Sequence, residues 1–136
     1  NISPEVAGYI AQLVDNHPYY VQQLAQLSCL RCEKDCSAET VDGALESLLD
    51  SLNLQFINIM DSLTEKQRNF LCALSDGVTQ LTSEKTLSTY RLGTNGNVRI
   101  IRNALLKRDI VDMEGRTVYI QDPVFKLWIV RQYSIL

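Results

Sequence analysis

Apolar residues recur at helical spacing from the beginning of the chain. Ser3-Pro4-Glu5 has the composition of a helix start, with a capping hydroxyl, a first-turn proline and an acid near the positive end of the helix dipole. Apolar residues then follow at steps of three and four positions, which predicts a short helix over residues 4–14.

Two further helices are predicted before residue 64. Pro18 opens the first of them, and a polar stretch at residues 33–37 separates it from a longer helix. The longer helix has one apolar stripe, made of Val41, Leu45, Leu48, Leu52, Phe56, Ile59 and Leu63. Residues 1–63 therefore predict an all-helical bundle that is small for an independent core.

A second module is predicted to begin at Thr64, because Thr64 and Gln67 have the spacing of a capping box. The helix that they start buries apolar residues and ends near Gly77. Thr82 or Ser83 caps a further short helix, and a turn follows that contains two glycines.

An amphipathic helix at residues 97–108 follows this turn, with Val98, Ile101 and Leu105 on its inner face. Two β-prone segments at residues 110–114 and 117–121 then flank a Glu-Gly-Arg turn, and Asp122-Pro123 caps a last helix. This order predicts a winged helix-turn-helix domain over residues 64–136, with a short β-hairpin as its wing. The predicted fold class is mainly α.

The composition is that of an ordinary globular protein, because 46% of the 136 residues are hydrophobic and 21% are charged. A long apolar run and a basic leader are both missing, so we expect no transmembrane helix, no membrane partner and a cytoplasmic location. The first residue is Asn1 rather than methionine, and we therefore expect the chain to be a piece of a longer protein.

The formal charge of −3 conceals two oppositely charged halves. Residues 1–63 carry nine acidic and two basic side chains, whereas residues 64–136 carry seven acidic and eleven basic ones. The basic half is suited to approach phosphates, although such an excess also falls within the scatter of a solvated surface.

Polar and basic side chains on and around the 97–108 helix are candidates for DNA contact. Arginine and asparagine can read guanine and adenine edges in a major groove, and an arginine on the wing can contact a backbone phosphate. The candidate residues are Thr94, Asn95, Asn97, Arg99, Arg102, Asn103, Lys107 and Arg116. The alternatives are a solvated helix face or a surface that packs against protein.

Three cysteines, Cys29, Cys32 and Cys36, have a spacing that invites a metal site. Structural zinc needs four ligands, and neither Cys72 nor His17, the only histidine, is near them in sequence. Because the spacing also places thiols on one helical face, we expect helix packing in a reducing compartment and no metal. No Ser/His/Asp set indicates an enzyme in its own right.

Residues 17–24, with the sequence HPYYVQQL, resemble the G-x-P-Y/F-x-x-Q-L segment of archaeal-type ATPases, P-loop proteins of the AAA+ and STAND group. The second half resembles the winged helix that follows the helical lid in the same family. Its matching stretches are residues 74–77 (LSDG), 92–99 (LGTNGNVR) and 119–128 (YIQDPVFKLW).

The resemblance implies a helical lid followed by a winged helix, in the C-terminal part of an ATPase that binds ATP and Mg²⁺. It implies that Pro18 contacts the adenine, and that the partners are the N-terminal P-loop core together with duplex DNA or a protein. The chain itself has no G-x-x-x-x-G-K-[ST] motif and no run ending in paired acids, so we expect no ATPase activity and no cofactor in this fragment.

The function that this resemblance implies is a switch, in which the lid and winged helix couple the nucleotide state to DNA or protein binding. Two alternatives need no nucleotide. One is a winged-helix regulator that binds DNA by itself, and the other is a protein-interaction module.

Overall fold

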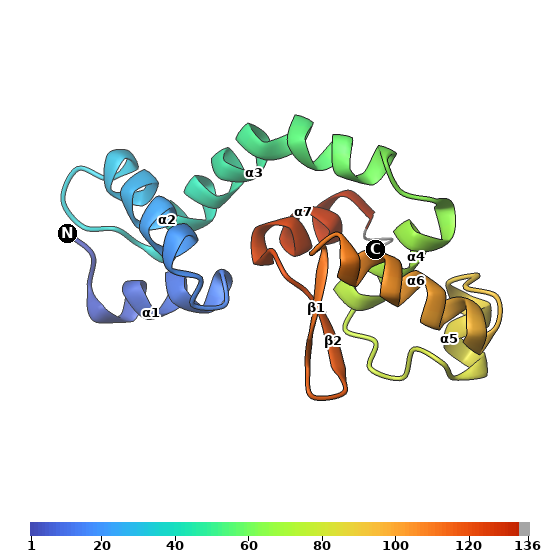
Figure 1. Cartoon of the computed structure of the whole chain (residues 1–136). Helices are drawn as coiled ribbons and strands as arrows, with labels where there is room; N and C mark the ends of the chain where they lie inside the picture. Colours follow the sequence, from blue (N-terminus) through green and yellow to red (C-terminus); the bar gives the residue numbers. More distant parts are fainter. Residues whose placement is uncertain (134–136) are drawn as a thin grey trace. The chain divides into compact units, whose positions relative to one another are not determined.

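The computed structural model describes residues 1–133, which form helices and one β-hairpin (Figure 1). The elements in chain order are α1 (Pro4–Leu13), α2 (Pro18–Arg31), α3 (Ala38–Asp61), α4 (Glu65–Ser75), α5 (Glu84–Thr89), α6 (Asn95–Lys107), β1 (Val111–Glu114), β2 (Thr117–Ile120) and α7 (Pro123–Tyr133). The mainly α fold class is confirmed. No helix in the described part of the chain is both long enough and apolar enough to cross a membrane.

The chain divides into two compact units, Asn1–Leu54 and Gln55–Leu136. Sequence analysis placed the boundary between residues 63 and 64, but the end of α3 packs with the second unit. Phe56 is 4% exposed, and the centroid of its ring lies 5.0 Å from that of Phe125 and 5.7 Å from that of Trp128. The last turns of α3 therefore belong to the same core as α7.

The first unit consists of α1, α2 and most of α3. The Ser3 hydroxyl accepts a hydrogen bond from the Val6 N–H at 3.2 Å, as the predicted cap requires. Asp15 and Asn16 both have positive φ values, and this left-handed turn separates α1 from α2. The buried apolar residues of this unit are Ile10, Val14, Leu24, Cys36, Val41, Ala44, Leu48 and Leu49.

The cysteines of the first unit do not share one helical face. Helix α2 ends at Arg31, and Cys32 is its C-cap with extended backbone angles, so Cys32 and Cys36 both lie in the loop before α3. These two cysteines form a disulfide, while Cys29 is a free and exposed thiol. The prediction that Cys32 and Cys36 pack as helical thiols is wrong, and the reason for expecting a reducing compartment falls with it.

After the end of α3, the second unit continues with a capping box at the start of α4. The predicted capping box is present, since the Thr64 hydroxyl accepts from the Gln67 N–H at 3.2 Å and the Gln67 side chain accepts from the Thr64 N–H at 3.0 Å. Arg68 closes the end of α3 by donating to the Leu63 carbonyl at 2.6 Å. Helix α4 then packs against α6, α7 and β2.

The hairpin pairs β1 with β2 in antiparallel register, from Val111 opposite Ile120 to Glu114 opposite Thr117. The turn consists of Gly115 and Arg116, and only Gly115 has a positive φ, at 62°. A glycine at the first turn position is the arrangement of a type II′ hairpin, whose twist matches that of the strands.

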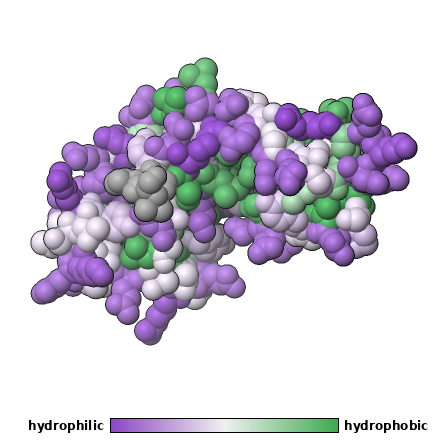
Figure 2. Space-filling model, turned by 180° about the vertical axis from the view of Figure 1, so that it is seen from behind, coloured by the Kyte–Doolittle hydropathy of each residue, from purple (hydrophilic) through white to green (hydrophobic). Residues whose placement is uncertain are grey.

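Polar side chains cover much of the visible surface, with apolar patches between them (Figure 2). The large apolar side chains that are exposed are Tyr19, Leu30, Leu54, Ile100, Tyr119, Val130 and Tyr133.

Candidate nucleic-acid interface

Helix α6 has one buried face and one exposed face. Val98, Ile101 and Leu105 are 3%, 6% and 0% exposed, as the apolar spacing predicts. Arg99, Asn103 and Lys107 lie on the exposed face at helical spacing. The helix contains no acidic residue, so every charge that it carries is positive.

The start of α6 uses two of the candidate residues for structure. The helix begins at Asn95, earlier than predicted, because the Thr94 hydroxyl caps it by accepting from the Asn97 N–H at 3.2 Å. The Asn97 side chain lies over Gly93, whose φ is 88°, in the space that a Cβ at residue 93 would occupy. Of these candidates, Asn95 is exposed and Asn97 is half-buried.

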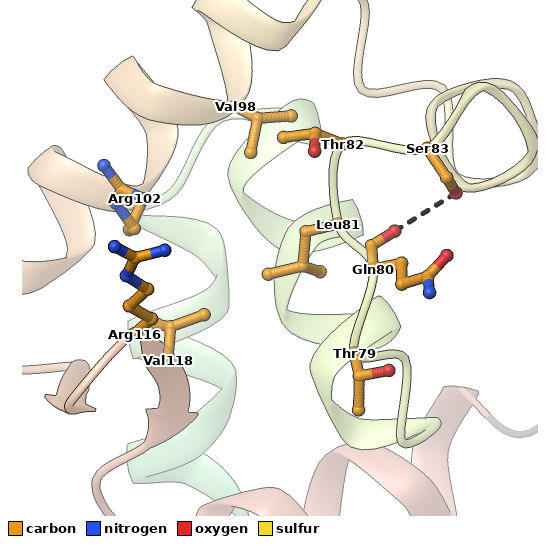
Figure 3. A pocket seen from close by; sticks show the side chains of 9 residues that line it. All are labelled: Thr79, Gln80, Leu81, Thr82, Ser83, Val98, Arg102, Arg116 and Val118. Atoms are coloured by element: carbon orange, nitrogen blue, oxygen red, sulfur yellow. Dashed lines mark hydrogen bonds between the residues drawn. The ribbon is translucent and has the colours of Figure 1, made fainter.

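A hollow of about 380 Å³ brings two candidate arginines together from different elements (Figure 3). Arg102 comes from α6 and Arg116 from the turn of the hairpin, and the two side chains lie on the same side of the hollow in the view. We call this site the arginine hollow; it is lined by Thr79, Gln80, Leu81, Thr82, Ser83, Val98, Arg102, Arg116 and Val118. No acidic side chain is among these lining residues.

The second unit therefore contains two tandem helices, α4 and α5, followed by a turn, a third helix, α6, and the hairpin of β1 and β2. Cationic side chains lie on α6 and on the turn of the hairpin. A family model described as a probable winged helix domain matches residues 54–131. The chain belongs to this family. No curated protein and no solved structure matches the chain.

The outer face of the wing differs in charge from α6. Asp112 and Glu114 are exposed on β1, and the Tyr119 hydroxyl of β2 donates to the Asp112 carboxylate at 3.4 Å. The Coulombic effect of Asp112 and this hydrogen bond raise the pKa of Tyr119. The outer face of β1 is therefore negatively charged, whereas the charges of α6 and of the wing's turn are positive.

One hydrogen bond joins the two helices on either side of the loop that lines the arginine hollow. The Tyr90 hydroxyl, at the end of α5, donates to the Asp76 carboxylate, at the end of α4, over 2.6 Å. This hydrogen bond, with burial and the charge of Asp76, raises the pKa of Tyr90 to about 12. The hydrogen bond thereby joins the end of α4 to the end of α5, and residues 79–83 between these helices form one wall of the hollow.

Sequence reasoning missed two features of the winged helix domain. Within residues 79–83 of the hollow's wall, a capping role was predicted for Thr82 or Ser83 but no part in a site, although threonine and serine between two helices were a visible signal. Ile100 was also missed, and it is 68% exposed on the same helix as Arg99. The sequence did contain a signal for its exposure, because Ile100 does not lie on the helical face that carries Val98, Ile101 and Leu105.

Pro18 lies outside the winged helix domain, as the exposed first residue of α2. The preceding residue, His17, has a buried Nδ1 atom without a hydrogen-bond partner in the described structure, and its ring lies 4.8 Å from that of Tyr20. A proline at the first position of a helix fits helix geometry without a ligand.

Cys29, Cys32 and Cys36 are the three cysteines whose spacing invites a metal site. Within residues 1–133, no three side chains of the types that ligate metals lie together as a cluster. Cys32 and Cys36 are joined to each other, which leaves Cys29 as the single thiol of the motif.

Proposed function

We propose that the winged helix domain binds duplex DNA through α6 and the tip of the wing. The observation that carries this proposal is the charge of α6, where Arg99, Arg102 and Lys107 stand without any acidic residue on the helix. A protein that neutralises phosphates with such side chains releases counterions, so its affinity falls linearly with salt on a double logarithmic scale.

The test is fluorescence anisotropy of the full chain with a random 20-base-pair duplex over a series of salt concentrations. We expect micromolar dissociation constants, and a slope of about −0.9 for each neutralised phosphate. Arg99→Ala should weaken binding, and Arg108→Ala is the matched control because it removes the same charge from the far end of α6. Equal effects of the two substitutions, or binding that ignores salt, would refute the proposal.

A specific observation favours protein as a second candidate partner. Ile100 is 68% exposed in the middle of α6, and apolar contact area of this kind is typical of protein interfaces as well as of contacts with thymine methyl groups. Ile100→Lys separates the two partners. It adds a positive charge and should preserve or strengthen non-specific DNA binding, whereas it should abolish an apolar protein contact.

We also propose that the chain is the lid and winged helix of an AAA+ or STAND-type ATPase, in which nucleotide state controls binding by the winged helix. Supporting this are the helical unit before the winged helix domain, the exposed Pro18 at the start of α2, and the resemblance of residues 17–24. ATP and Mg²⁺ would be held by a P-loop core elsewhere in the parent protein.

The reading frame upstream of Asn1 tests this second proposal. A P-loop about two hundred residues before Asn1 is expected, and a frame without one contradicts it. In the full-length protein, Pro18→Ala should lower ATP affinity, while Ser3→Ala, at the cap of the neighbouring helix, should not.

A further inference from the structure

The arginine hollow has the composition of a small anion site. Two arginines line it together with the apolar side chains of Leu81, Val98 and Val118, and none of the lining residues is acidic. In the part of the chain that the structure describes, neither the Arg102 side chain nor the Arg116 side chain has a hydrogen bond or an ion pair. Two like charges in one hollow repel each other, so an anion between them is favoured by both.

The chemistry of the lining suits an oxyanion such as a phosphate. Each guanidinium offers a planar fork of donors that matches two phosphate oxygens. Thr79 and Thr82 also line the hollow, and neither side chain has a hydrogen bond within the described residues, so their hydroxyls are available as further donors. The Ser83 hydroxyl is already occupied, because it caps α5 by accepting from the Thr86 N–H at 3.2 Å.

We propose that Arg102 and Arg116 together hold one phosphate group, which the proposed function supplies as a phosphodiester of the bound duplex. Arg102 lies toward the hollow on the flank of α6, and not on the face that carries Arg99 and Asn103. The two parts of α6 therefore have different tasks. Arg99 and Asn103 face the base edges, while Arg102 and Arg116 clamp the backbone and set the position of the helix.

A double-mutant cycle in salt-dependent DNA binding tests the shared phosphate. Arg102→Ala and Arg116→Ala should each lower the affinity by roughly tenfold for every duplex sequence, and should each reduce the salt slope by about 1. Because both side chains hold the same phosphate, the double variant should lose no more than about 1 from the slope. A loss of about 2 would show two separate phosphates and would overturn the inference.

Two controls separate misfolding and general charge loss from the loss of the clamp. Arg116 is exposed, so its removal leaves the core intact, and Arg102→Lys keeps the charge of the half-buried position without its fork. Arg102→Lys should retain most of the salt slope while it loses affinity. Arg108→Ala should reproduce neither effect.

A titration with inorganic phosphate, followed by the amide shifts of residues 79–83, separates this inference from the proposed function. Saturable shifts that Arg102→Ala and Arg116→Ala both abolish would support the hollow as a phosphate site, even if the chain bound no duplex. Salt-dependent DNA binding that neither substitution changes would overturn the inference and leave the proposed function standing. The absence of both phosphate shifts and DNA binding would overturn both.

Discussion

Replacing Phe56 by alanine tests whether the end of α3 belongs to the core of the winged helix domain. Phe56 is 4% exposed and its ring contacts those of Phe125 and Trp128. Truncating a buried phenylalanine costs about 3–5 kcal/mol, and each lost aromatic pair adds about 0.5–1.5 kcal/mol. A unit of about 80 residues has a total stability of only about 4–12 kcal/mol. Phe56→Ala should therefore unfold a large fraction of the second unit in water.

The chain offers its own probe and its own control for this experiment. Trp128 is the single tryptophan and is 1% exposed in the second unit, so urea unfolding followed by its fluorescence reports on that unit. Leu54→Ala, two residues earlier in α3 but at a 71% exposed position, should change the free energy of unfolding by less than about 0.5 kcal/mol. Phe56→Leu nearly conserves volume and should cost less than about 2 kcal/mol. A loss under about 1 kcal/mol for Phe56→Ala, or an equal loss for Leu54→Ala, would refute the assignment of α3 to this core.

The other predictions concern the turns that position α6. Because hydrogen bonding to Asp76 raises the pKa of Tyr90 to about 12, the folded state holds this proton more tightly than the unfolded state. The stabilisation from the Tyr90 hydrogen bond is complete below pH 10 and is lost as the pH rises from 10 to 12. The urea midpoints of unfolding at pH 9 and at pH 11 should therefore differ more in the wild type than in Tyr90→Phe. Gly93→Ala should destabilise by about 1–3 kcal/mol, because residue 93 has a φ of 88° and the Asn97 side chain fills the space of its Cβ. Gly96→Ala, within α6 and with room for a Cβ, should instead be neutral or stabilising by up to about 1 kcal/mol in thermal unfolding.

The winged helix could be predicted from sequence because its signals are local. The capping box at Thr64, the spacing of Val98, Ile101 and Leu105, and the Gly115 turn each involve residues only a few positions apart. Periodicity and turn chemistry operate over that same range. The structure follows each of them.

The boundary between the two units could not be predicted from such local signals. The apolar stripe of α3 runs without interruption from Val41 to Leu63, and a helical period is the same whichever core it faces. Only the rings of α7, more than sixty residues later in the chain, show that Phe56 belongs to the second unit.

The disulfide and the arginine hollow could not be predicted from the sequence for a related reason. The polar stretch at residues 33–37 was predicted to separate two helices, but its sequence does not show that Cys32 and Cys36 approach each other across it. Arg102 and Arg116 meet because the hairpin folds back beside α6, and spacing along the chain does not encode that approach.

The composition of α6 also limits how the cell can regulate this surface. The helix has no carboxylate and no histidine, the side chain whose charge changes most readily near neutral pH. Acidification of the surroundings would therefore leave the charge of the helix itself unchanged. A signal that acts through the charge of this helix must therefore add negative charge, by covalent modification or by a competing polyanion.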